Sequence, residues 1–356
     1  MHWVIGILAW NEESSIAATL RSLGEQTLFA KAAMDSASVE VIVVPNGCTD
    51  QTANVAEAAL DRYIRCHEAA TARVESLAEG GKSNAWNQLI HRIGPENTDY
   101  YFLMDADIEL LTSDTLERMV GVLLSNPHAQ IATDTPVKHI AKKKRLTLTE
   151  RILLTAGSMT QTAPGQLTGQ LYCARGPVLR SLFIPKGLIV DDGFIKQLVC
   201  TDGYSRASDP SRIARAEGAA HLFECYTRLL DIWNHQIRQA VGHTLYTYFT
   251  GYMRRKMPER PIFESLKQKC RAEPEWFMLH ARNEIKARGF WVMDRGSFWV
   301  RWRRAKAAKG MRKLRFLALA AAATPFDAAI FIVSNHRLKT GRVNSVWKDT
   351  KTSTLQ

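Results

Sequence analysis

The chain has 356 residues and a hydrophobic content of 46%, which is enough to bury a large core and excludes a wholly disordered protein. Its net charge of +12 is uneven, because residues 251–356 hold 24 Lys and Arg against 8 Asp and Glu, or +16, which leaves −4 for residues 1–250. A basic C-terminal third predicts an anionic partner, either a membrane surface or a nucleic acid. The six cysteines form no C-x-x-C pair, so we expect reduced thiols in a cytosolic protein.

The first predicted element is a strand at residues 3–10, WVIGILAW, a short apolar run without the basic start or cleavage-like end of a signal peptide. A helix should follow it, since Ile16, Leu20 and Leu23 recur at helical spacing. Residues 39–60 repeat this order, with a β-branched run, a cluster of turn residues and a second helix.

Two glycines open a third helix at residues 80–93, and residues 100–110, YYFLMDADIEL, give a further strand. Strands and helices that alternate in this way predict a mostly parallel sheet with helices on both faces. Ligands of such sheets bind beyond the carboxyl ends of the strands. We expect three polar strand ends to meet at this edge: Trp10-Asn11-Glu12-Glu13, Pro45-Asn46-Gly47-Cys48 and Asp105-Ala106-Asp107.

Two pairs of acids stand out from the rest of the sequence. Residues i and i+2 of an extended segment point to the same side, so Asp105 and Asp107 can face one point. Two carboxylates without a neighbouring His or Cys suit Mg²⁺ or Mn²⁺, although D-x-D also occurs by chance in solvated loops. Asp191 and Asp192 precede a predicted helix, whose dipole favours acids at its start whatever their function.

Five stretches in this order resemble glycosyltransferase family 2, whose members have the GT-A fold: LAWNEESSIAATLRSLGEQT, VIVVPNGCTDQT, GGKSNAWNQLI, YYFLMDADIEL and GLIVDDGF. They cover roughly residues 3–200, and the ordered set is more specific than any single motif. The resemblance implies an α/β fold with a mostly parallel central sheet and helices on both faces. We predict a nucleotide-sugar-binding and catalytic domain at residues 1–242, and a basic, helical, membrane-associating region at residues 243–356.

The resemblance also implies which residues bind the nucleotide sugar. Trp10, Asn11 and Glu12 would line the pocket for the base and ribose, Asn46 would contact the base edge, and Lys82 would lie beside the nucleotide. Relatives usually carry Asp where this chain has Asn46, and an amide has no charge. The base is therefore left open between uracil, guanine and thymine.

For the chemistry, the resemblance implies that Asp105 and Asp107 hold the ribose and a metal-bound diphosphate, with Mg²⁺ or Mn²⁺ as the cofactor. Asp192, preceded by Asp191, would be the general base of an inverting displacement. Arg238 would lie near the leaving diphosphate, and the glutamine after it replaces a Trp of relatives, which argues against a processive synthase.

The basic stretch at residues 296–316, GSFWVRWRRAKAAKGMRKLRF, interleaves aromatic and cationic residues. In a single helix, Trp299, Trp302, Met311 and Leu314 would share one face. This pattern predicts an amphipathic helix that lies in the headgroup region of an anionic bilayer.

The apolar stretch at residues 316–333 is barely long enough to span a bilayer, and it contains Pro325 and Asp327. We expect it to lie in the membrane plane on the inner face of the cell membrane rather than to span, while a helical hairpin packed on the enzyme is the soluble alternative. A membrane-bound enzyme suits a lipid-linked acceptor.

Three other functions stay open at this point. A nucleic-acid-binding protein would use the basic region, but no recognition motif is present, and we expect no nucleic-acid partner. A nucleotide-sugar binder without catalysis would not need all of Asp105, Asp107 and Asp192. A nucleotidyltransferase would release pyrophosphate instead of a nucleoside diphosphate.

Overall fold

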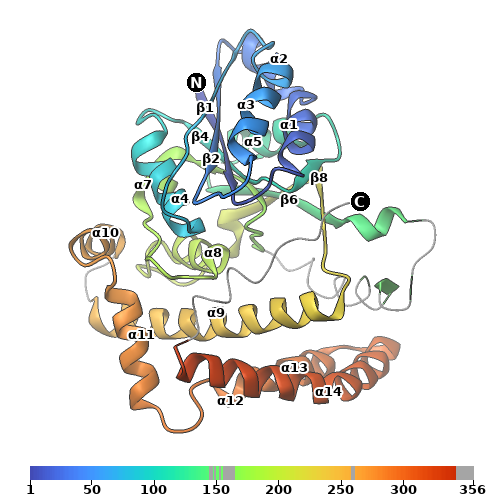
Figure 1. Cartoon of the computed structure of the whole chain (residues 1–356), viewed down its shortest axis with the longest axis vertical. Coiled ribbons are helices and arrows are strands. Elements are labelled where there is room, and N and C mark those ends of the chain that lie inside the picture. The colour runs from blue at the N-terminus through green and yellow to red at the C-terminus, as the bar shows by residue number, and fades with distance from the viewer. Residues whose placement is uncertain (144–146, 148–149, 152–153, 155–164, 258–260, 342–356) are drawn as a thin grey trace.

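The computed structural model describes residues 1–143, 147, 150–151, 154, 165–257 and 261–341 (Figure 1). Its eight-stranded sheet has the order β3-β2-β1-β4-β7-β6-β8-β5. The strands are β1 (His2–Ala9), β2 (Ser38–Pro45), β3 (Ala70–Val74), β4 (Tyr100–Asp105), β5 (Ile108–Leu110), β6 (Ile131–Lys138), β7 (Leu171–Arg175) and β8 (Ile213–Phe223). The first four are parallel, whereas β7 runs antiparallel to β4 and β6, and β5 runs antiparallel to β8. The predicted α/β fold is confirmed, with a mixed second half.

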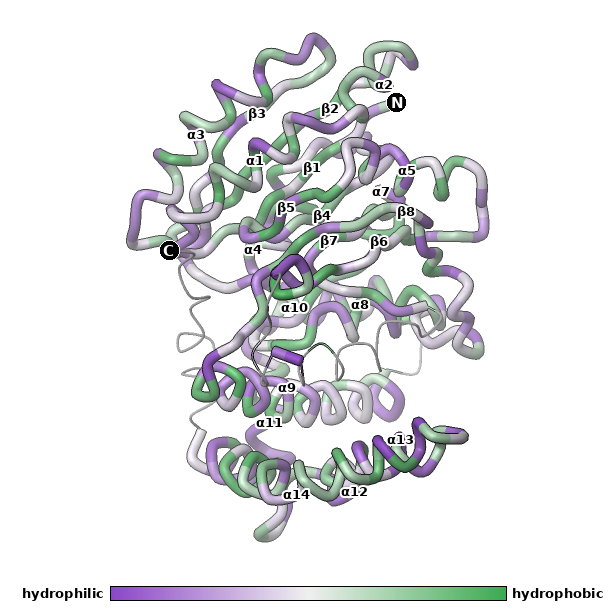
Figure 2. Tube along the Cα trace, turned by 90° about the vertical axis from the view of Figure 1, so that its right-hand side faces the viewer, coloured by the Kyte–Doolittle hydropathy of each residue, from purple (hydrophilic) through white to green (hydrophobic). Residues whose placement is uncertain are grey.

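Helices cover both faces of the sheet, as the wholly apolar strands require (Figures 1 and 2). Side chains of β1 alternate between the two cores: Trp3, Ile5 and Ile7 face one core, and Val4 and Leu8 face the other. The first core is completed by α1 (Ile16–Gly24), α2 (Leu28–Met34), α3 (Thr52–Tyr63) and α5 (Thr115–Ser125). The second is completed by α4 (Lys82–Gln88), α7 (Gly176–Ser181), α8 (Asp191–Thr201), α9 (Leu229–Lys256), α10 (Phe263–Ala272) and α11 (Trp276–Ala287).

The long helix α9 connects the sheet to a layer of C-terminal helices, α12 (Arg295–Phe298), α13 (Val300–Ala307) and α14 (Gly310–Lys339). In Figure 1, α13 and α14 lie on the side of α9 that faces away from the sheet. The boundary that we predict at residue 242 falls inside α9, where Ile237, Val241 and Leu245 are buried in one core. The division into two domains stays a prediction.

The basic C-terminal segment is two antiparallel helices and not one. Gly310 has a φ of +59°, a left-handed conformation that favours glycine, and it separates α13 from α14. The single amphipathic helix that we predicted at residues 296–316 is therefore wrong. Trp302 turns inward, because its indole N–H finds a partner there and donates to Thr324 Oγ1 over 3.1 Å.

Candidate active site

A cleft of about 590 Å³ lies at the carboxyl ends of β1, β2 and β4. The segment at residues 166–170 and one side of α9 close it. The structure brings nine of the ten predicted site residues into its lining: Trp10, Glu12, Asn46, Lys82, Asp105, Asp107, Asp191, Asp192 and Arg238.

Asn11 is the predicted residue that does not line the cleft. It has a φ of +54°, a left-handed conformation that asparagine tolerates, and its Oδ1 accepts a hydrogen bond from the Thr49 backbone N–H over 2.8 Å. Asn11 therefore ties the loop after β1 to the turn after β2.

Trp10 and Glu12 enter the cleft from the loop after β1. Ser15 Oγ donates to Glu12 Oε2 over 2.5 Å. Burial, followed by the charge of Asp107, raises the pKa of Glu12 to about 7. Glu12 is thus poised between its neutral and charged forms near neutral pH, so it can both donate and accept hydrogen bonds from a polar ligand such as a ribose.

Asn46 joins the ends of two elements, which explains why an amide stands where relatives usually carry an acid. Its Nδ2 donates to the Ala9 carbonyl over 2.7 Å, and its Oδ1 accepts from the Gly81 backbone N–H over 2.9 Å. A carboxylate could not make the first bond, because it has no proton to donate. One N–H of the amide remains for a ligand, so the predicted base contact stays a prediction.

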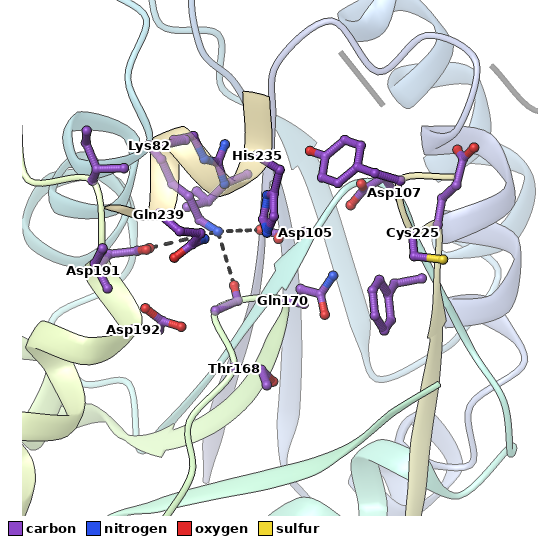
Figure 3. A pocket seen from close by; sticks show the side chains of 18 of the residues that line it. Lys82, Asp105, Asp107, Thr168, Gln170, Asp191, Asp192, Cys225, His235 and Gln239 are labelled. Atoms are coloured by element: carbon purple, nitrogen blue, oxygen red, sulfur yellow. Dashed lines mark hydrogen bonds and ion pairs between the residues drawn. The ribbon is translucent and has the colours of Figure 1, made fainter. Parts of the chain in front are cut away.

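Lys82 links the two acid pairs (Figure 3). Its Nζ donates to Asp105 Oδ1 over 2.8 Å and to the Gly169 carbonyl over 3.2 Å, and it lies 3.9 Å from Asp191 Oδ2. Burial alone would lower the pKa of Lys82, but the charges of Asp105 and Asp191 outweigh it and raise that pKa above its usual value. Burial raises the pKa of Asp105 to about 6, although Lys82 opposes this shift.

Replacing Lys82 with Met should lower the free energy of unfolding at pH 8 by about 2–3 kcal/mol, because Asp105 and Asp191 lose the cation between them in a site that is largely buried. The deficit should shrink below pH 6, since Asp105 has a raised pKa of about 6 and becomes neutral there. Urea unfolding at both pH values measures this. Lys82→Arg is the matched control, and an equal loss in both variants would show that shape and not charge matters.

Asp107 is the acid of the first pair that Lys82 leaves free. Among the described residues no Lys or Arg pairs with it, and burial raises its pKa. Nor do the described residues contain a group of three or more His, Cys, Asp or Glu that could hold a metal ion. Magnesium commonly takes one or two carboxylates and completes its shell with water and substrate phosphates. The two carboxylates fit a divalent cation that binds together with a diphosphate.

Asp191 and Asp192 occupy the first turn of α8, as the helix dipole favours. The Gly193 backbone N–H donates to Asp192 Oδ1 over 2.7 Å. Burial, followed by the charge of Asp191, raises the pKa of Asp192 to about 6. A carboxylate in a cleft with a pKa this close to neutral is a suitable general base.

The wall formed by α9 supplies residues that the sequence did not predict for the site, among them His235 and Gln239 beside Arg238. The His235 ring lies 5.0 Å from the ring of Tyr226, and its Nδ1 has no hydrogen-bond partner among the described residues. Burial, followed by the charge of Arg238, lowers the pKa of His235 to about 4, so the ring is neutral at pH 7. Its spacing of three from Arg238 on one helix is the signal that could have identified it.

A parallel half-sheet with paired carboxylates at its carboxyl edge is the architecture of GT-A glycosyltransferases. The sequence profile described as "Glycosyl transferase family 2" matches residues 4–178, and the chain belongs to that family. It is a glycosyltransferase. None of the curated proteins compared matches this sequence.

Solved structures share the fold at low sequence identity. Mannosyltransferase PcManGT from Pyrobaculum calidifontis, in complex with GDP-Man and Mn²⁺, is 19% identical, with a TM-score of 0.51 over 98% of this chain and 87% of that one. Glucosyl-3-phosphoglycerate synthase from Mycobacterium tuberculosis, with Mg²⁺ and UDP, is 19% identical, with a TM-score of 0.44 over 72% of this chain and 80% of that one. TarS 1–349 from S. aureus is 15% identical, with a TM-score of 0.44 over 97% of this chain and 92% of that one.

Proposed function

We propose that this glycosyltransferase moves a sugar from a nucleotide diphospho-sugar to an acceptor hydroxyl, with inversion at the anomeric carbon. The observation that supports it is that one cleft holds two acid pairs, which β4 and α8 supply separately and Lys82 joins. Transfer from a nucleotide sugar has two tasks for acids, since the diphosphate must leave and the acceptor must lose a proton.

On the donor side, Asp107 and Asp105 would hold Mg²⁺ or Mn²⁺ on the diphosphate. Once bound, the cation would stabilise the negative charge that develops on the leaving group. Trp10 and Glu12 line the same cleft and would contact the base and ribose, while Arg238 would neutralise part of the diphosphate charge. The Mn²⁺ that accompanies GDP-Man in PcManGT agrees with this assignment.

On the acceptor side, Asp192 would take the proton of the attacking hydroxyl. The acceptor oxygen then forms its bond to the anomeric carbon while the bond from that carbon to the diphosphate oxygen breaks. Because attack and departure are on opposite sides of the carbon, a single displacement inverts the configuration.

The acceptor is proposed to be lipid-linked, with the enzyme peripheral on the cytoplasmic face of an anionic membrane. Among the described residues, α14 is the one helix that is long and apolar enough to cross a membrane, which by itself is weak evidence. The basic charge of residues 251–356 supports the choice of an anionic surface.

The test is a panel of GDP-mannose, UDP-glucose and dTDP-glucose with Mn²⁺ and lipid-extract acceptors. We expect one donor to release its nucleoside diphosphate and to give a product whose anomeric configuration, read by NMR, is opposite to that of the donor. Release of pyrophosphate would indicate nucleotidyl transfer instead, and a retained configuration would contradict the role of Asp192 as base.

A further inference from the structure

The outer face of α14 is apolar along the length of the helix. Only 11% of its most apolar 18-residue stretch is buried. Met311, Leu314 and Ile332 are 71%, 64% and 57% exposed. Exposed residues recur every three or four positions, which places them on one side of the helix: Met311, Leu314, Ala318, Ala321, Pro325 and Ile332. We name this side the outer stripe. A helix on a water-exposed surface normally carries polar residues there.

Polar side chains of the same helix point inward instead. Asp327 is the only charged residue between Arg315 and Arg337, and Arg301 of α13 binds it with Nε at 2.8 Å and Nη2 at 3.1 Å. Thr324 accepts the indole N–H of Trp302, as described above.

Further along α14, Asn335 Oδ1 accepts from the Val292 backbone N–H over 2.7 Å, and its Nδ2 donates to the Phe290 carbonyl over 2.8 Å. The Phe326 ring packs edge-on against Trp233 of α9 at 5.5 Å. A helix that left this position to span a bilayer alone would expose Asp327 and Asn335 to lipid, which is costly.

Cations surround the turn between α13 and α14. All of them are exposed, and none forms an ion pair with a described residue: Arg303, Arg304, Lys306, Lys309, Arg312, Lys313 and Arg315. At the opposite end of the stripe an apolar hollow of about 310 Å³ lies between Trp299, Phe331 and Ile332, with Arg295 beside it. Exposed aromatic residues next to cations are typical of the interface between headgroups and acyl chains.

We propose that α14 lies in the plane of an anionic bilayer, with the outer stripe among the upper acyl chains and the cations of the α13–α14 turn on the lipid phosphates. Nucleic acid would complement the cations only, whereas an anionic bilayer offers an apolar layer and negative charge in one surface. The inference rests on the proposed membrane association and specifies its surface and depth. It does not depend on the transfer chemistry.

The test is co-sedimentation of the full chain with vesicles of phosphatidylcholine, alone or with about one-third phosphatidylglycerol. We expect binding to the mixed vesicles that weakens in high salt. Met311→Gln with Ile332→Gln should weaken it at least tenfold. Met34→Gln is the matched control, because Met34 is 83% exposed on α2, at the far end of the molecule (Figure 1). Arg312→Gln and Lys313→Gln should each cost about fivefold on the mixed vesicles and nothing on phosphatidylcholine alone.

A second measurement separates an in-plane helix from a spanning one. The protein in native membranes should be released by alkaline carbonate, and Trp299 fluorescence should be quenched more by lipids brominated near the headgroup than near the chain end. Retention after carbonate, binding to DNA but not to vesicles, or a lipid-free dimer broken by Met311→Gln would each overturn the proposal. Vesicle binding requires no donor, so a negative result in the sugar-transfer assay leaves this test intact.

Discussion

Replacing Asp192 with Asn should lower kcat by about 10²–10⁴-fold and leave the affinity for the nucleotide sugar within a factor of about two. The amide has nearly the same shape as the carboxylate but cannot accept the proton of the acceptor hydroxyl. Steady-state kinetics with a saturating acceptor, together with calorimetric donor binding, separates the two quantities. Activity equal to the wild type would remove Asp192 from its assigned role.

The pH dependence gives a second readout of the same group. Since burial raises the pKa of Asp192 to about 6, the carboxyl is protonated below that pH and cannot act as a base. Wild-type kcat should therefore fall as pH drops through about 6, and the residual activity of Asp192→Asn should not follow this curve.

Asp191→Asn provides the matched control for this titration. The charge of Asp191 contributes to the raised pKa of Asp192, so its removal should move the acidic limb of the profile to lower pH. If Asp192 were only a helix-start acid, neither variant would displace the limb.

Stability distinguishes loss of the base from damage to the fold. The folded-state pKa of Asp192 is raised above the value of 3.8 for an unperturbed aspartate, so ionisation in the folded protein costs stability as pH rises. Asp192→Asn should therefore unfold at the same or a higher urea concentration than the wild type at pH 8. A large loss of stability would mean that the activity change reports on folding.

The first half of the sheet and its functional edge could be predicted from the sequence because each strand is a local pattern. Apolar runs mark β1, β2 and β4, and polar residues follow each of them directly, so parallel pairing alone brings Trp10, Asn46 and Asp105 to one edge. The mixed half could not be predicted in this way. β8 is buried at irregular intervals, and its pairing with β6 shifts register between Thr133 and Thr135, so its pattern lacks a clear period of two.

Contacts between distant segments account for what the sequence left out of the site. Lys82 is adjacent to two glycines in sequence, and nothing local indicates that it bonds Asp105 and also approaches Asp191, which lies more than a hundred residues later. His235 faces the cleft only because α9 crosses it. The break at Gly310 is likewise decided by backbone conformation, and it turned a predicted single helix into a hairpin.

Replacing Asp107 with Asn should abolish most of the metal response of the protein. Asp107 lines the cleft without a cationic partner among the described residues, whereas Asp105 is already bonded to Lys82. The amide keeps the size of the side chain and removes its charge, which is the property that attracts a hard divalent cation. We expect Mn²⁺ affinity in the presence of a nucleoside diphosphate to fall at least tenfold, and kcat to fall by about 10³-fold.

Calorimetric titration of Mn²⁺ with GDP, UDP or dTDP measures this without any turnover, so a metal effect is visible even if the acceptor is unknown. Asp114→Asn is a suitable control, because that acid lies on the surface at the start of α5 and pairs with Arg118. Because burial raises the pKa of Asp107 in the metal-free protein, removing its charge should also stabilise the fold above that pKa, so Asp107→Asn should be better folded and yet insensitive to Mn²⁺. Unchanged Mn²⁺ affinity in Asp107→Asn would place the cation elsewhere and remove the main reason for assigning the donor diphosphate to this end of β4.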